Sequence, residues 1–234
     1  TKTNASHTSL LAPTGLTDHN NSTRNSHNPD IIIMANGQPA IVHSYSNSDS
    51  GYVYLYCRVF NGSTWTAKTI TYNLYFGLSF PSVAVDANGT IHVVSHGKFD
   101  SASKIGIWHT KSTDNGNTWT EPTQIFYNAL QDQDLVSLSA DGLNLYLIWK
   151  SASSFSLWQI RKMVYSGGSW GASTQITSQT TYGVDDPNIT YHKVTGSKLG
   201  FIWWDEQDDK VMFDYFNTNQ PPQAPTNLTR GPFD

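Results

Sequence analysis

Carboxyl groups are the most reactive side chains that this chain places at recurring positions. Asp30 and Asp186 stand where two short apolar strands are expected to begin, and Glu206 follows a pair of tryptophans. Hydrolysis of a glycosidic bond needs two carboxyl groups, one to protonate the leaving oxygen and one to activate water or attack the sugar. Convergence of these three residues would therefore predict catalysis, although Asp at the start of a strand also serves to cap turns.

A second group of residues favours binding without chemistry. Flat aromatic rings beside amide and carboxylate acceptors suit sugars, which present C–H faces and hydroxyl groups, and aromatic residues also dominate protein-binding hot spots. The residues expected to contact such a ligand are Tyr45, Asp49, Tyr75, Phe76, Trp204, Asp205 and Glu206.

Histidines and acidic residues of the chain could also act as a base or as metal ligands. His92 and His96 lie four apart on one expected strand, hence on one face, where a lyase would use a His with a Tyr as base and acid. Packing between strands is the simpler interpretation of both. No His or Cys has zinc spacing, and the run Asp205–Asp209 offers oxygen ligands to calcium without the glycine and register of an EF-hand. We therefore expect no metal and no cofactor, calcium being the single candidate.

Two repeated marks predict the elements that would position these residues. Turn dipeptides end in Gly37, Gly89, Gly142 and Gly196, at spacings of 52, 53 and 54 residues, each between short alternating apolar runs. A second turn follows in the first three units and ends in Trp65, Trp119 and Trp170. Four-stranded units of this length are typical of propeller blades.

The predicted fold class is all-β: a β-propeller of four four-stranded antiparallel blades. The propeller would span residues 1–217, with a leader over 1–27 and blades at about 28–76, 77–130, 131–182 and 183–217. The last unit lacks a fourth strand, and Ser9–Leu16 in the leader is predicted to supply it and close the ring. The alternatives are a loose leader or part of a larger ring.

The end of the chain differs in composition from the repeats. Residues 218–234 begin with the Pro/Gln-rich stretch Asn219–Pro225, and the sequence Ala224–Thr229 resembles the opening strand of a fibronectin type III or Ig-like module. We therefore expect further domains of the same polypeptide as neighbours of the propeller.

Composition excludes several classes of partner. The chain has 14 basic and 18 acidic residues and a net charge of −4, which argues against nucleic acid. No apolar run approaches the 18 residues or so of a membrane span, and one cysteine, Cys57, allows no internal disulfide. The composition, low in Lys and rich in Asn, Ser and Thr, suggests a secreted or cell-surface protein.

One of the repeated turns matches a family motif. Ser112, Asp114, Gly116 and Trp119 fall in the pattern S-x-D-x-G-x-T-W, which resembles the Asp box, or BNR repeat, of sialidase-like β-propellers. The resemblance implies a propeller in which this box is structural and lies on the face opposite the ligand. The equivalent turns at Trp65 and Trp170 keep a Gly but lack the Asp.

Sialidase activity is not expected within this resemblance. A sialidase needs clustered arginines for its substrate carboxylate, but the four arginines are scattered, and Asn28-Pro29-Asp30-Ile31 stands where the family has Arg-Ile-Pro. Our expectation is extracellular recognition of a glycan or surface protein at one propeller face, without catalysis. A carbohydrate-active hydrolase or lyase using axial carboxylates is the alternative, and a structural spacer is a third.

Overall fold

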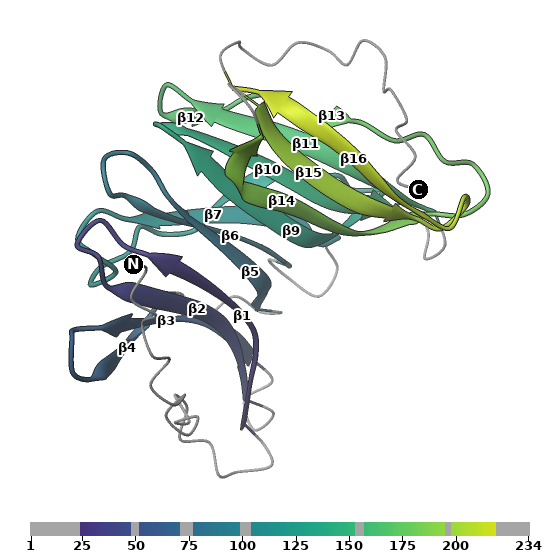
Figure 1. Ribbon diagram of the computed structural model, residues 1–234. Coiled ribbons are helices and arrows are strands. Elements are labelled where there is room, and N and C mark those ends of the chain that lie inside the picture. The colour runs from purple at the N-terminus through teal and green to yellow at the C-terminus, as the bar shows by residue number, and fades with distance from the viewer. Residues whose placement is uncertain are drawn as a thin grey trace, which may run out of the picture.

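All regular elements in the part of the chain that the structure describes are β-strands. The computed structural model describes residues 24–47, 52–70, 77–98, 104–152, 157–194 and 198–218. Four antiparallel sheets follow one another along the chain and fan out from their innermost strands (Figure 1). The all-β propeller predicted from the repeat is confirmed, while the predicted closing strand Ser9–Leu16 lies outside the described residues.

Each sheet is a blade in which consecutive strands are hydrogen-bonded neighbours. Blades one and two comprise β1 (Arg24–Ile33), β2 (Pro39–Asn47), β3 (Tyr52–Phe60), β4 (Trp65–Thr69), β5 (Leu78–Val85), β6 (Ile91–Gly97), β7 (Gly106–Ser112) and β8 (Thr123–Phe126). Blades three and four comprise β9 (Asp132–Asp141), β10 (Asn144–Ala152), β11 (Trp158–Ser166), β12 (Ser169–Trp170), β13 (Thr174–Gln175), β14 (Val184–Val194), β15 (Lys198–Asp205) and β16 (Lys210–Asn217).

Fourth strands are the least regular part of each blade. In blade two the sequence predicts a strand from Trp119, but β8 begins only at Thr123, because Trp119 belongs to the preceding turn and Pro122 has no N–H to donate. In blade three the fourth strand is split into β12 and β13, which both pair with β11. Blade four has three described strands, as its sequence predicts.

Three apolar layers join consecutive blades. The first packs residues such as Leu55 and Cys57 of β3 against Val93 and Trp108 of blade two. The second sets Leu147 and Trp149 of β10 against blade two, and the third sets the other face of blade three, including Ile148, against blade four. Alternation along β10 thus buries both faces of that strand, as a central blade requires.

Hydrogen bonds near the axis repeat at every described junction. The backbone N–H of Val83 donates to Asp30 Oδ2 at 2.9 Å, that of Leu138 to Ser82 Oγ at 3.1 Å, and that of Ile189 to Ser137 Oγ at 3.0 Å. In each case a side chain on one inner strand accepts from the backbone of the next inner strand. We call these contacts the axial clasps, since they fix the register between blades.

A chain of four polar side chains crosses from blade two to blade three. Trp170 Nε1 donates to His109 Nδ1 at 3.2 Å, His109 Nε2 lies 3.0 Å from His92 Nδ1, and His92 Nε2 lies 3.3 Å from Asp86 Oδ2. Because indole can only donate, His109 carries its proton on Nε2 and donates to His92, which then donates to Asp86. This direction of donation requires a neutral His109.

Burial enforces that neutral state. His109 is 8 % exposed, and this burial, followed by the nearby His92 and Lys111, lowers its pKa to about 3. Burial also lowers the pKa of His92, although the hydrogen bond to Asp86 opposes that effect. His109 therefore stays uncharged well below the usual pKa of about 6.5, beside a His92 whose pKa is also lowered.

This pair predicts acid sensitivity of the fold. Between pH 6.5 and about 3, the unfolded chain binds a proton at His109 and the folded chain does not. The free energy of unfolding is therefore highest above pH 6.5 and falls as the pH drops through this window. His109 alone should remove about 1 kcal/mol of unfolding free energy per pH unit in that window. Urea unfolding at several pH values should show a shallower slope for His109→Gln, whose amide can still accept and donate. His27→Gln on β1 is the control, and an unchanged slope in His109→Gln would contradict the assignment.

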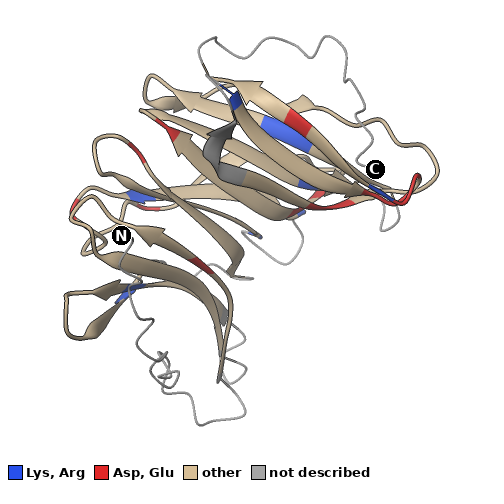
Figure 2. Ribbon diagram, in the orientation of Figure 1, with Lys and Arg blue, Asp and Glu red and all other residues tan. Residues whose placement is uncertain are grey.

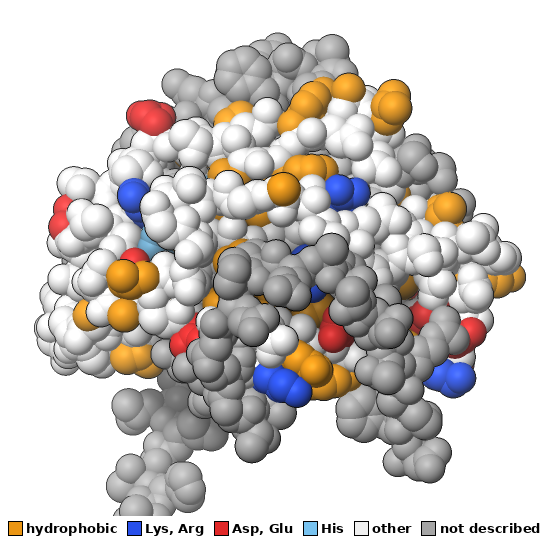
Figure 3. All heavy atoms as spheres, turned by 90° about the horizontal axis from the view of Figure 1, so that it is seen from above, with side chains coloured by type: hydrophobic (Ala, Val, Ile, Leu, Met, Phe, Trp, Pro, Cys, Tyr) orange, Lys and Arg blue, Asp and Glu red, His pale blue; other side chains and the backbone are white. Residues whose placement is uncertain are grey.

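The surface carries few charges, as the composition predicts. Seen from above, it shows few charged side chains and scattered apolar ones among other side chains and backbone (Figure 3). Acidic residues gather at the turn between β15 and β16, where Asp205, Glu206, Asp208 and Asp209 lie (Figure 2). Within the described ranges, no helix is long and apolar enough to cross a membrane.

Candidate functional site

The inner strands begin on one face of the fan, which we call the front face, and each is distorted there. Asn28, Phe80, Leu135 and Asp186 have positive φ angles of 51°, 47°, 42° and 47°, and each lies where the ladder to the next strand shifts register. Proline follows at three of these four positions and cannot donate to the ladder. Positive φ is strained for Phe and Leu, and such strain tends to gather at functional sites.

These four bulges border a cleft that runs between the inner strands. The cleft has a volume of about 840 Å³ and is lined by residues 28–33, 80–85, 135–138 and 186–189. Polar groups of Asn28, Asp30, Asp186 and Asn188 share its wall with apolar side chains such as Ile31. A cleft of this size and mixed lining is suited to a small organic ligand.

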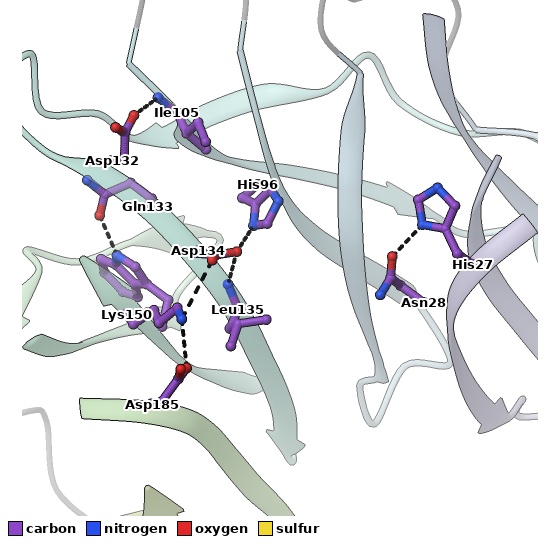
Figure 4. A network of polar contacts seen from close by, with 11 residues as sticks. His27, Asn28, His96, Ile105, Asp132, Gln133, Asp134, Leu135, Lys150 and Asp185 are labelled. Carbon is purple, nitrogen blue, oxygen red and sulfur yellow. Dashed lines mark hydrogen bonds and ion pairs between the residues drawn. The ribbon is translucent and has the colours of Figure 1, made fainter. Parts of the chain in front are cut away.

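Beside this cleft, charged side chains from three blades converge (Figure 4). Lys150 of β10 places its Nζ 2.7 Å from Asp185 Oδ1 of β14 and 3.7 Å from Asp134 Oδ2 of β9. On the other side of Asp134, His96 Nδ1 of β6 lies 3.0 Å from Oδ1. We call His96, Asp134, Lys150 and Asp185 the front cluster.

The two carboxylates of the front cluster are held in the same way. Asp134 Oδ1 accepts the backbone N–H of Leu135 at 2.9 Å, and Asp185 Oδ1 accepts that of Asp186 at 2.8 Å. Each donor is the positive-φ residue that directly follows, so the bulge itself orients the carboxylate. The side chains are still 29 % and 30 % exposed, so both carboxylates are anchored but reachable from solvent.

The protonation of Asp134 follows from its neighbours. Burial alone would raise its pKa, but the hydrogen bond and charge of His96, the Leu135 N–H and the Lys150 ammonium outweigh burial, and the pKa is lowered. Asp134 is therefore an ionised carboxylate at neutral pH, suited to accept a proton or a hydroxyl hydrogen bond.

Buried polar contacts support the strand that carries Asp134. Trp149 Nε1 donates to Gln133 Oε1 at 2.8 Å, and both residues are fully buried. Asp132 accepts from the backbone N–H of Ile105 and from Lys104 Nζ, both at 2.9 Å. These bonds tie β9 to its neighbours on either side of Asp134.

Aromatic rings surround the front cluster. Phe80 is 37 % exposed and its ring centroid lies 5.1 Å from that of His96. Lys150 Nζ lies 4.7 Å from the centroid of Trp158. Charged groups and aromatic rings therefore occur together here, which is the combination that sugar binding uses.

The structure places the predicted carboxylates in three different settings. Asp30 lines the cleft but forms an axial clasp, accepting from Val83 N, Ser82 Oγ and Ile31 N. Asp186 is exposed and lines the opposite wall of the cleft, while Glu206 is half-buried in the β15–β16 turn. Asp30 thus has a clear structural role, and Asp186 is the member nearest the front cluster in sequence.

Some of the predicted ligand-binding residues are buried, one is exposed, and others lie outside the described residues. Tyr45 is buried, with its ring 5.3 Å from that of Tyr56. Asp205 is buried as well: its Oδ1 caps the following turn through Gln207 N, and its Oδ2 accepts from the Gln179 side chain. Trp204 is exposed and donates weakly to Asp209 at 3.4 Å. Asp49, Tyr75 and Phe76 lie outside the described residues.

The acidic turn and the S-x-D-x-G-x-T-W turn have internal bonding. Asp205 uses both oxygens within the protein, and among the described residues no three His, Cys, Asp or Glu side chains are grouped to hold a metal ion.

In the S-x-D-x-G-x-T-W turn, Asp114 accepts from Thr118 N, Thr118 Oγ1 and Ser112 Oγ, which lowers its pKa to about 2. Gly116 packs against Cys57 of blade one, and Trp119 Nε1 donates to Gly116 O.

Sequence reasoning missed most of the front cluster. The predicted carboxylates include Asp186 but not its neighbour Asp185, and Lys150 is not among the predicted site residues. The bulge that directly follows each of the two aspartates is visible only in the structure, because the proline after Asp186 has no counterpart after Leu135. His96 was treated as packing, and it does pack on Phe80, but it also contacts Asp134.

Known proteins resemble the chain in structure alone. No protein-family model matches it, and no curated protein matches its sequence. An α-L-arabinanase of Penicillium chrysogenum superposes with a TM-score of 0.62 at 10 % identity, over 80 % of this chain and 61 % of that one. Zg3597, a family 117 glycoside hydrolase of Zobellia galactanivorans, gives 0.61 at 10 % over 86 % and 70 %, and the Trypanosoma rangeli sialidase gives 0.58 at 12 % over 82 % and 36 %.

These likenesses concern the fold. The chain spans about three fifths of the length of the arabinanase and about a third of the sialidase. At 10–12 % identity they carry no assignment of residues. With the four repeated sheets, they establish that the chain has a β-propeller fold.

Proposed function

We propose that the protein is a carbohydrate-active enzyme that cleaves a glycosidic bond at the front cluster. One observation carries this proposal: Asp134 and Asp185 flank a single ammonium group, each oriented by a bulge N–H and each partly open to solvent. Glycoside hydrolysis requires two carboxyl groups that flank the scissile bond, about 5–5.5 Å apart in retaining enzymes and about 6.5–9.5 Å apart in inverting ones. The fold shared with an arabinanase and a family 117 glycoside hydrolase supports the same conclusion.

The residues would divide the work according to their surroundings. Asp134 stays ionised and would act as base or nucleophile, and Asp185 would supply the second carboxyl group. Lys150 would hold the pair apart and donate to a sugar hydroxyl, while Phe80 would contact the flat face of a sugar ring. The cleft beside the cluster would receive one end of the chain of sugars.

A second candidate is glycan recognition without cleavage. It is favoured by the surroundings of Asp134, whose pKa is lowered, whereas a general acid needs a raised pKa at neutral pH. Under either proposal the ligand is a glycan, and the composition of the chain favours a place outside the cell. Sialidase activity is not proposed, since Arg58 and Arg161 lie on β3 and β11, bonded to His43 and Ser173.

One experiment separates the two candidates. The protein is incubated with arabinan oligosaccharides, β-1,3-galactan oligosaccharides and, as a negative control, sialyllactose, and both reducing-end release and binding heat are measured. We expect release from a neutral glycan and none from sialyllactose. Binding without release would favour recognition, and absence of both for every neutral glycan would overturn the glycan assignment.

A further inference from the structure

The first and last blades each leave one apolar face uncovered. Contacts join β1 to β5, β5 to β9 and β9 to β14, whereas β14 and β1 make no comparable contact within the described ranges. On blade one, Ile31 and Ile33 are 61 % and 63 % exposed. On blade four, the residues exposed on the face away from blade three are Ile202, Trp204, Val211 and Tyr215. The two faces flank an opening in the fan (Figure 1).

The axial clasps end at the same opening. Asp30, Ser82 and Ser137 stand two residues after their bulges and accept from the next inner strand. Asn188 stands at that position in blade four and is exposed, and no inner strand within the described ranges donates to it. At the far side of the opening, the Ile31 N–H is instead satisfied by its own neighbour, Asp30 Oδ1, at 2.8 Å.

The outer side of blade four is also unfinished. Blades one to three have a fourth strand or its remnants beyond the third, but β16 pairs only with β15 among the described strands. Its other edge presents backbone N–H and C=O groups along Lys210–Asn217. A free edge beside exposed apolar side chains is a surface that attracts another strand.

Two stretches of the chain could supply that strand. Residues 219–234 follow β16 directly and contain Pro221, Pro222, Pro225 and Pro232, which cannot donate to a ladder. Residues 1–23 lead into Arg24 at the start of β1, on the blade that borders the opening. They carry no Lys, Arg, Asp or Glu between Lys2 and Asp18, and they contain Leu10, Leu11 and Leu16. The single proline within Ser9–Leu16 is tolerated on an outermost strand.

We propose that residues 1–23 dock in the opening, with Ser9–Leu16 pairing antiparallel to the free edge of β16. The connections between blades support this occupant. From each fourth strand the chain crosses to the next inner strand through residues 70–77, 127–131 and 176–183. Residues 17–23 would make an equivalent crossing from blade four to β1, of similar length and in the same direction. This inference is independent of the proposed enzyme activity.

Hydrogen–deuterium exchange of the full chain tests the docking. Alternate backbone amides of β16 should exchange slowly in the wild type and at least 10-fold faster in the double variant Leu10→Asp, Leu11→Asp. The control adds the same two charges outside residues 1–23, as Thr226→Asp, Asn227→Asp, and should leave exchange unchanged. Amides of β6, deep in blade two, report whether a variant still folds.

Two exchange results would overturn the proposal, and a disulfide experiment covers the case in which the leucine variant unfolds. Equal exchange of β16 in the wild type and the leucine variant overturns it, and protection that disappears on dilution assigns the edge to a second copy instead.

If the leucine variant unfolds, cysteine pairs test the docking. Ala12→Cys should form a disulfide with one of Val211→Cys, Phe213→Cys or Tyr215→Cys. Thr226→Cys is the control partner. Cys57 will not compete, because burial raises its pKa to about 12. Failure of all three pairs contradicts the docking.

Discussion

Replacing Asp134 by Asn is expected to lower the rate of glycosidic cleavage at least 100-fold. The amide still accepts the Leu135 N–H through its oxygen, so the bulge stays in place, but it can neither take a proton nor attract His96 and Lys150 as an anion. General acid–base groups typically contribute about 10²- to 10⁴-fold to a rate. Reducing-end release from the best glycan substrate, with KM and kcat separated, measures the effect.

A control for this substitution lies on the same strand. Asp132 is two residues from Asp134 and also pairs with a lysine, but its partners are Lys104 and the Ile105 N–H, outside the front cluster. Asp132→Asn should keep cleavage within a few-fold of the wild type. Equal losses in the two variants would mean that the charges serve only the stability of β9, and the catalytic assignment would be wrong. If glycan binds without cleavage, Asp134→Asn should weaken binding while Asp132→Asn does not.

Replacing Trp149 by Ala is expected to cost about 3 to 5 kcal/mol of unfolding free energy, the usual range for a fully buried large aromatic. Trp149 is 0 % exposed, its ring lies 5.1 Å from Phe126, and its indole donates to Gln133. The change leaves a cavity between blades two and three and a buried Gln133 Oε1 without its donor, and both effects destabilise. Urea unfolding followed by tryptophan fluorescence gives the difference.

Comparison with other tryptophan variants isolates the cause. Trp149→Phe keeps most of the ring volume but removes the donor, so it should lose less than Trp149→Ala and still lose measurably. Trp204→Ala, at a position 40 % exposed, should change the unfolding free energy by less than about 1 kcal/mol. A loss below about 2 kcal/mol for Trp149→Ala would show that the layer between blades two and three relaxes around the cavity.

The repeated turns were enough to predict the blades. Gly37, Gly89 and Gly142 have φ angles of 79°, 80° and 63°, a conformation that suits glycine, so their spacing marks hairpins directly in the sequence. Alternation of apolar residues between those turns then defines strands with two faces. The same local logic predicted the missing fourth strand of blade four. It predicted the start of β8 less accurately, because the tryptophan at which that strand was expected to begin belongs to the preceding turn.

The candidate site could be predicted only in outline. The sequence indicated that acidic residues lie near the starts of inner strands, since that follows from the order of strands within a blade. It could not tell Asp185 from Asp186 or show that Asp30 binds the neighbouring blade. Those assignments depend on bulges that shift the register by local backbone strain, and a shift of one residue turns a side chain to the opposite face.

The sequence by itself therefore determined the blades, because period, turn and alternation are local properties of the chain. Only the tertiary structure decided which charges meet. His96, Asp134, Lys150 and Asp185 come from three blades, and the ladder of hydrogen bonds, the axial clasps and the buried layers bring them together across more than 80 residues of sequence. Electrostatic pairing and burial act through space, so no pattern along the chain could have set their distances or the protonation of Asp134.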